Sequence, residues 1–236
     1  MPRPIYNILS DDLNNIYLHT DNEIIKYIFP YTTYKKYQNR KIDASDVVDA
    51  SNPLRILYFD AQDGMLLLLS SEMSEMGRVD IGRLAGFDPG NLVCQSGQGS
   101  FWLYNAQLNE CELYDKNNQV AHSTNNLYQV IDHQQVVKIK EVDRKLYVFT
   151  NLQRMYAFDG YGSLLYQAPK KGTHVHMIGN IMFLRNNSTL YYNGLNNIID
   201  SINLNIQGNF YTLNNKYLFV VTNEKLMVSE HFLTKQ

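Results

Sequence analysis

The chain has 236 residues, of which 44% are hydrophobic and 12% aromatic, enough to bury a sizeable core in a single domain over residues 1–236. Its formal net charge of −2 excludes the concentrated positive charge that a phosphate backbone requires, so no nucleic-acid partner is expected. The local basic pairs at residues 35–36 and 170–171 are interpreted as solvated turns.

The start of the chain and its apolar runs bear on the compartment. Residues 1–4 are not followed by the apolar segment and small-residue cleavage site of a signal peptide, so we expect a cytosolic protein or a processed mature chain. The longest apolar run, residues 65–69, is too short to cross a bilayer, and no transmembrane segment is expected. Cys94 and Cys111 lie in what we interpret as two strands of one unit separated by a third, which favours buried free thiols over a disulfide.

Short β-rich runs recur along the chain, each followed by a polar turn and a second β-rich run. In chain order the first runs of these pairs cover residues 15–18, 55–59, 100–104, 145–149, 180–184 and 217–221. Asn, Asp and Gly dominate the turns, because they tolerate positive φ or hydrogen-bond their own backbone. Equivalent positions in successive runs are roughly 35 to 45 residues apart, which is the length of one four-stranded propeller blade.

The repeats also predict the number and kind of blades. The fourth repeat is the most regular, with β-rich runs at 136–142, 146–150, 155–158 and 164–167. The first repeat begins with an inner strand at 5–9, and the last ends with its third strand at 225–232. We therefore predict an all-β fold, a β-propeller of six blades of mostly four antiparallel strands, whose last blade is incomplete. The outer edge of that blade is either open to pairing with another chain or a short strand blunted by Lys235 and solvent.

Residues 10–18 resemble the blade signature of the NHL and related six-bladed propellers, in which an Asp-containing turn precedes an Ile-Tyr strand. A broader resemblance covers residues 50–59, 100–109 and 157–162. These segments are similar to a family of small exported proteins of the Bacteroidota that includes the plug subunit of the type IX secretion translocon. The resemblance implies a non-enzymatic periplasmic propeller that docks on the outer-membrane translocon protein and plugs its periplasmic opening. The missing export signal departs from this family, and a processed mature chain would account for it.

Two features of the sequence bear on metal binding. His174 and His176 flank one residue of a predicted strand, so both side chains fall on one face, as at the beginning of a two-histidine site. No third ligand lies nearby in the sequence, which favours two polar positions on the wetter face of an inner strand. Asp60, Asp63 and Gly64 suggest a calcium loop, but the distal Glu is missing, which indicates a hairpin turn. We expect no metal and no cofactor.

Motifs of nucleophilic or phosphate-binding catalysis are missing from the sequence. The acidic pair at residues 11–12 is interpreted as part of a turn, because adjacent strand residues face opposite ways and could not act together as acid and base. Residues 97–99 carry Gly-x-Gly but open a strand rather than a helix, so we expect a turn. Trp102 lies in an apolar strand and is expected to pack in the core. The prediction is a protein that is not an enzyme; the alternative is a propeller enzyme or a small-ligand or metal binder with a site at the central channel.

The segment at residues 71–78 is the strongest candidate for partner binding. Met73 and Met76 are three residues apart, so one helical turn at 71–77 would place both side chains on one side, close to Arg78. This turn is the one helix that we expect in the chain. Flexible thioethers suit adaptable contacts. The alternative is that both Met side chains pack over the core of the second repeat. Because a plug has to leave when a substrate arrives, we expect a modest and rather polar contact area.

Overall fold

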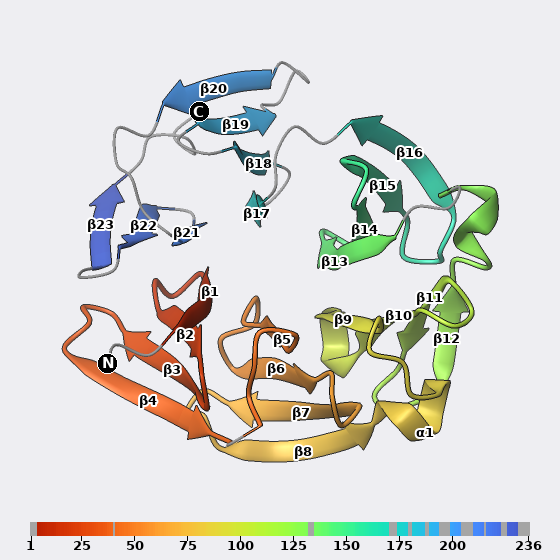
Figure 1. Ribbon diagram of the computed structural model, residues 1–236, viewed down its shortest axis with the longest axis horizontal. Coiled ribbons are helices and arrows are strands. Elements are labelled where there is room, and N and C mark those ends of the chain that lie inside the picture. Colours follow the sequence, from red (N-terminus) through yellow and green to blue (C-terminus); the bar gives the residue numbers. More distant parts are fainter. Residues whose placement is uncertain are drawn as a thin grey trace. The chain divides into compact units, whose positions relative to one another are not determined.

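The computed structural model describes residues 4–39, 41–131, 135–169, 174–178, 181–186, 189–193, 199–203, 210–214, 216–222 and 226–230. Over these ranges the chain forms antiparallel sheets in succession, with a short helix, α1 (Ile81–Ala85), and two single 3-10 turns (Gly97–Gly99 and Leu127–Gln129) between strands. Two compact units are present, one formed by Met1–Asp80 with Leu204–Gln236 and the other by Ile81–Asn203 (Figure 1). No helix of the described ranges is long and apolar enough to span a membrane.

The first unit contains two four-stranded sheets and one three-stranded sheet, each with its strands in chain order. The first sheet consists of β1 (Ile5–Ser10), β2 (Ile16–Thr20), β3 (Glu23–Ile28) and β4 (Thr33–Gln38). The second consists of β5 (Val47–Asp49), β6 (Arg55–Asp60), β7 (Met65–Ser70) and β8 (Glu75–Asp80). The three-stranded sheet consists of β21 (Phe210–Leu213), β22 (Tyr217–Val221) and β23 (Leu226–Glu230).

The second unit contains three further sheets, again of four antiparallel strands in chain order. The first consists of β9 (Leu92–Gln95), β10 (Phe101–Asn105), β11 (Glu110–Tyr114) and β12 (Val120–Ser123). The second consists of β13 (Val136–Val142), β14 (Lys145–Thr150), β15 (Arg154–Phe158) and β16 (Leu164–Pro169). The third consists of β17 (His174–Ile178), β18 (Ile181–Asn186), β19 (Thr189–Asn193) and β20 (Ile199–Asn203).

The predicted four-stranded antiparallel repeat is confirmed. Five four-stranded blades are present in the part of the chain that the structure describes, where six blades were predicted, and the last repeat contributes a sheet of three strands there, as the prediction of an incomplete last blade had it. The predicted helical turn at 71–77 is wrong as well. Residues 71–74 form a turn, in which Met73 has a φ of 61°, and residue 75 already begins β8.

Buried aspartates fix a turn within the first blade and the segment that enters the second. Asp11 accepts hydrogen bonds from the main chain and side chain of Asn15 and from the Tyr17 hydroxyl at 2.8 Å. Asp46 accepts one from the Tyr58 hydroxyl at 2.9 Å. Burial and the neighbouring carboxylate raise the pKa of both tyrosines, so both remain donors. Asp11 therefore ties the turn between β1 and β2 to β2, and Asp46 ties the segment before β5 to β6. Residues 11–12 are confirmed as part of a turn.

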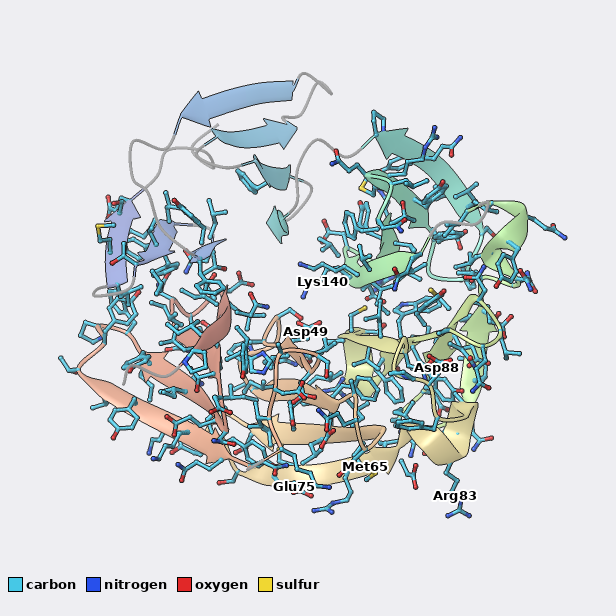
Figure 2. The ribbon with its side chains drawn as sticks, viewed as in Figure 1. Asp49, Met65, Glu75, Arg83, Asp88 and Lys140 are labelled. Atoms are coloured by element: carbon cyan, nitrogen blue, oxygen red, sulfur yellow. The ribbon has the colours of Figure 1, made fainter. Side chains whose placement is uncertain are left out.

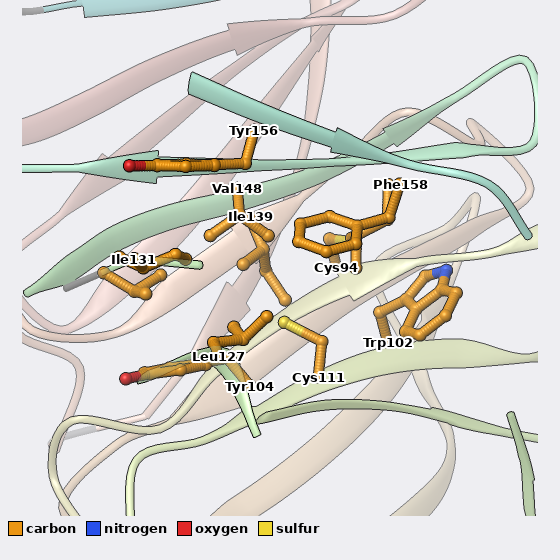
Figure 3. Packing of buried hydrophobic residues seen from close by; sticks show 12 residues of the cluster. Cys94, Trp102, Tyr104, Cys111, Leu127, Ile131, Ile139, Val148, Tyr156 and Phe158 are labelled. Carbon is orange, nitrogen blue, oxygen red and sulfur yellow. The ribbon is translucent and has the colours of Figure 1, made fainter. Parts of the chain in front are cut away.

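The core of the second unit lies between sheets and contains the two cysteines and the tryptophan (Figure 3). Trp102 is fully buried, as predicted, and its Nε1 donates to Glu141 Oε2 at 2.7 Å. Cys94 on β9 and Cys111 on β11 are free and buried with β10 between their strands, which confirms the prediction from their spacing. Burial raises the pKa of the Cys111 thiol, so it behaves as a small apolar side chain.

The first and last sheets of the chain are neighbours within the first unit. β21 lies beside β1, and Ile8 and Ile16 pack with Phe219 in one core cluster. Ser10 Oγ donates to the main-chain oxygen of Leu213 at 2.7 Å, and Asn214 Nδ2 donates to the main-chain oxygen of Asp11 at 3.2 Å. Residues about 200 positions apart in the sequence are thus joined by apolar packing and by hydrogen bonds.

Candidate docking surface

The fourth strands of the blades carry most of the exposed side chains. β4, β8 and β16 are exposed over most of their length, whereas the second strands β6, β10 and β14 are almost fully buried. The second strands are covered on both sides by neighbouring strands and by neighbouring sheets, while a fourth strand has a hydrogen-bonded neighbour on one side only.

A β-bulge recurs in three of the fourth strands, β8, β12 and β16, and adds one residue to each. The register of β7 with β8 shifts so that Met76 has no partner across the ladder. The same shift leaves Ala121 on β12 and Leu165 on β16 without partners. A bulge re-aims the extra side chain and bends its strand, and the extra residues Met76 and Leu165 are 54% and 47% exposed.

In the first unit, an exposed methionine and two ion pairs lie on the fourth strands and on the turn before β8. We call the following residues the β4–β8 surface: Lys35, Glu72, Glu75, Met76 and Arg78. Lys35 Nζ on β4 lies 2.8 Å from Glu72 Oε2 in the turn before β8, so the two blades are linked at this surface. Arg78 lies 2.7 Å from Glu75 along β8, and Figure 2 shows Glu75 on this outer strand, with Asp49 on the innermost strand of the same sheet.

A buried lysine supports the turn beneath this surface. Lys26 on β3 is 4% exposed, and its Nζ donates to the main-chain oxygen of Ser71 at 3.1 Å. The ammonium also lies 5.6 Å from the ring centre of Tyr17. Burial lowers the pKa of Lys26, while Lys35 lowers the pKa of the exposed Glu72 carboxyl. The hydrogen bond from Lys26 therefore fixes the turn that carries Glu72, so this turn can contact a partner without rearranging.

The predicted partner-binding residues divide between the core and this surface. Met73 is 3% exposed and packs in the core cluster of the first two blades, as the alternative interpretation had it. Met76 and Arg78 lie on β8 and are both exposed, so the structure brings these two together and separates Met73 from them. Lys35 was missed, because the basic pair at 35–36 was interpreted as a turn, whereas it lies in β4.

The other candidate sites are ordinary turns or lie outside the described side chains. Asp60 Oδ1 accepts from the main chain of Gln62 and Asp63 at 3.1 and 2.9 Å, which makes the predicted hairpin turn. Gly97–Gly99 forms a 3-10 turn between strands, as predicted in outline. His174 and His176 lie in β17, and their side chains lie outside the described part of the structure. Among described residues, no three His, Cys, Asp or Glu side chains are grouped as a metal site would require.

One buried histidine was not singled out from the sequence. His19 on β2 is 2% exposed, and its Nε2 has no hydrogen-bond partner. Burial lowers its pKa to about 4, although a hydrogen bond to the main chain of Asp43 and the charge of that residue act in the opposite direction. The Tyr6 ring contacts the imidazole edge to face at 5.5 Å. His19 is therefore neutral near pH 7 and acts as a core side chain there.

No protein-family model matches the chain, and no curated protein sequence matches it. Many solved structures share its fold, among them the following three. Streptogramin B lyase is 10% identical, with a TM-score of 0.63 over 98% of this chain and 85% of the lyase. The Pan2 WD40 domain of Neurospora crassa is 10% identical, with a TM-score of 0.61 over 99% of this chain and 78% of that one. A protein of unknown function from Bacteroides caccae is 13% identical, with a TM-score of 0.58 over 89% of this chain and 86% of that one.

These similarities decide the fold. The chain is a β-propeller. It is all-β, and its blades are antiparallel sheets of four strands. A lyase and a WD40 domain share this architecture, so a function has to be argued from particular residues of this chain.

Proposed function

We propose that this propeller is a non-enzymatic docking protein of the periplasm, which binds the outer-membrane protein of a type IX secretion translocon and plugs its periplasmic opening. The observation that carries the docking role is the β4–β8 surface. The choice of partner and compartment rests on the resemblance of residues 50–59, 100–109 and 157–162 to a family that includes such a plug.

The chemistry of the β4–β8 surface suits a reversible contact. Met76 is more than half exposed and offers a flexible thioether, and Met is enriched at protein interfaces. The ion pairs Lys35–Glu72 and Arg78–Glu75 supply charged groups near it. Exposed pairs of this kind contribute only about 0–1 kcal/mol, so a partner's charges can replace them at little cost. An exposed thioether among exchangeable charges suits a contact that has to be released.

Affinity purification from cells that encode the protein tests this function. A tagged chain is purified from solubilised envelopes as wild type, as Met76→Glu and as Leu54→Glu, where Leu54 is an exposed leucine between β5 and β6 that serves as the matched control. We expect the translocon barrel with wild type and Leu54→Glu, and a loss of about tenfold or more with Met76→Glu, equivalent to about 1.4 kcal/mol. Recovery of wild type without an outer-membrane barrel, or equal recovery with Met76→Glu, would refute the proposal.

A further inference from the structure

The three sheets of the first unit meet at two junctions, and the two are packed unequally. Among the residues that the structure describes, the core cluster of the first two blades contains ten buried apolar side chains. The cluster between the first and last sheets contains four, which are Ile8, Ile16, Phe219 and Val221. Its other six apolar side chains are only partly buried, against three in the larger cluster. We call this second interface the β1–β21 junction, and fewer of its apolar side chains are withdrawn from water.

The chain itself also restrains the two junctions unequally. β4 ends at Gln38 and β5 begins at Val47, so residues 39–46 hold the first two blades close together. Ser10 on β1 and Thr212 on β21 are 202 positions apart in the sequence. The β1–β21 junction therefore depends on non-covalent contacts alone.

One buried side chain, Asn214, supplies much of the hydrogen bonding at this junction. It is 3% exposed and lies in the turn between β21 and β22. Its Oδ1 accepts from the main-chain N–H groups of Lys216 and Tyr217 at 2.9 and 2.8 Å. Its Nδ2 donates to the main-chain oxygen of Asp11 at 3.2 Å and to Asn14 Oδ1 at 3.0 Å. The oxygen of the amide thus builds its own turn, while the nitrogen binds the first blade.

A second polar contact lies where β1 meets β21. Ser10 Oγ donates to the main-chain oxygen of Leu213 at 2.7 Å and lies 3.2 Å from Thr212 Oγ1. Thr212 is 2% exposed, so this contact is shielded from water. Because only four buried apolar side chains accompany them, these hydrogen bonds and those of Asn214 provide a large share of the stability of the closed junction.

Aromatic rings complete the junction and remain partly in water. The Tyr31 ring meets that of Phe219 edge to face at 6.2 Å, and the Phe29 ring stacks on that of Tyr217 at 6.0 Å. Phe29 is 44% exposed. Separating a half-exposed stack costs less than separating a buried one, because less of its surface is withdrawn from water in the closed state.

We propose that the β1–β21 junction opens reversibly, with β21–β23 separating from the first blade as one sheet while the first two blades stay folded. Segments with few buried apolar contacts open at a lower free energy than the core of a domain. The sheet keeps its own ladder when it separates, because β22 is hydrogen-bonded to both β21 and β23. The open form exposes apolar side chains of β1, β2 and β22 that the closed form buries. The β4–β8 surface takes no part, so the opening is independent of the proposed docking.

Hydrogen exchange of the purified chain in low concentrations of urea tests the proposal. We expect the amides of β22 to exchange through openings at least about tenfold more frequent than those of β6, a difference of about 1.4 kcal/mol. β6 is the reference because it is likewise paired on both sides and belongs to the blade that stays folded. Equal opening free energies for β22 and β6 would overturn the proposal.

A reversible crosslink shows whether the opening takes place at this junction. Ser10→Cys combined with Thr212→Cys places two thiols where the oxygens lie 3.2 Å apart, close enough for a disulfide between β1 and β21. The oxidised form should exchange about tenfold or more slowly at β22 than the reduced form of the same variant, which is the matched control. Exchange at β6 should not change. If oxidation left β22 unaffected, the openings would be fraying within the last sheet, and the proposal would be wrong.

The amide nitrogen of Asn214 is the group that we expect to control how often the junction opens. Asn214→Asp keeps an acceptor for its own turn but places a carboxylate oxygen where the donor to Asp11 was. We expect exchange at β22 to become about tenfold faster, with β6 unchanged. Asn52→Asp is the matched control, because Asn52 Oδ1 accepts from the main chain of Leu54 between β5 and β6 of the second blade. Equal effects of the two substitutions at β22 would contradict this role of Asn214.

Discussion

Gly162, in the turn between β15 and β16, is the residue whose substitution we expect to destabilise the fold most. Its φ is +90°, and a Cβ built there would lie 2.1 Å from the main-chain oxygen of Ser123 and 2.9 Å from the nitrogen of Thr124. A left-handed conformation costs a non-glycine residue about 1–2 kcal/mol. The contacted atoms belong to the main chain and cannot rotate away, so β12 and the turn must separate. We expect Gly162→Ala to lower the free energy of unfolding by about 3–5 kcal/mol, a large part of the stability of an ordinary domain.

Urea unfolding followed by fluorescence measures this loss, because Trp102 is the sole tryptophan and is buried in the same unit. Gly160→Ala in the same turn is the matched control, since a Cβ there meets its nearest atom, the Arg144 oxygen, at an ordinary 3.4 Å. Gly97→Ala meets nothing within 4 Å. Both controls should lose less than about 1 kcal/mol. If Gly162→Ala lost no more than Gly160→Ala, the close approach of the turn to β12 would be refuted.

Three further outcomes are expected. Tyr17→Phe removes a buried hydrogen bond to Asp11 and should cost about 1–3 kcal/mol in urea unfolding, whereas Tyr34→Phe on the surface should cost almost nothing; equal costs would contradict the buried pair. Burial lowers the pKa of His19 to about 4, from an unfolded value near 6.5, so the free energy of unfolding should fall by about 3 kcal/mol as the pH is lowered from 7 to 4. The stability of His19→Leu should depend less on pH over that range. An unchanged pH profile would contradict the burial of a neutral His19. Cys111 should resist thiol-labelling reagents until the chain is unfolded in urea; labelling of the native protein at the same rate would contradict its burial.

The repeat could be predicted because its determinants are local. Alternating apolar runs favour strands, and an Asp or Asn that hydrogen-bonds the main chain two residues later closes a turn within a few positions. Asp60 and Asn105 do this after the second strands of their blades, where the sequence indicated turns. The incomplete last repeat could be predicted in the same way, since its last β-rich run, at 225–232, is its third.

The helical turn at 71–77 failed because a hairpin satisfies the same residues better. Ser70 Oγ accepts from the main chain of Glu72 and Ser74, and the Ser70 amide donates to the Ser74 oxygen at 2.8 Å. These bonds place Met73 at positive φ and direct its side chain into the core. The spacing of Met73 and Met76 predicted that their side chains lie together on a helical turn. In the structure a hairpin forms instead of a helix, and the two side chains are separated.

The surfaces were harder to predict than the strands, because exposure depends on pairing between segments. Met76 and Leu165 are exposed at bulges, and a bulge appears only when two strands are aligned. The burial of His19 likewise depends on the packing of the first two blades around β2. Sequence patterns therefore identified the β8 region as a candidate for docking but could not select Met76 from its neighbours.

Site-specific photocrosslinking in the cells that encode the protein tests the docking surface most directly. A photoreactive side chain is placed at Met76, and at Leu54 as the control. We predict that the chain carrying the group at position 76 crosslinks to the outer-membrane barrel of the translocon and that the chain carrying it at position 54 does not. Crosslinking that is absent at position 76, or equal at both positions, would contradict docking through the β4–β8 surface.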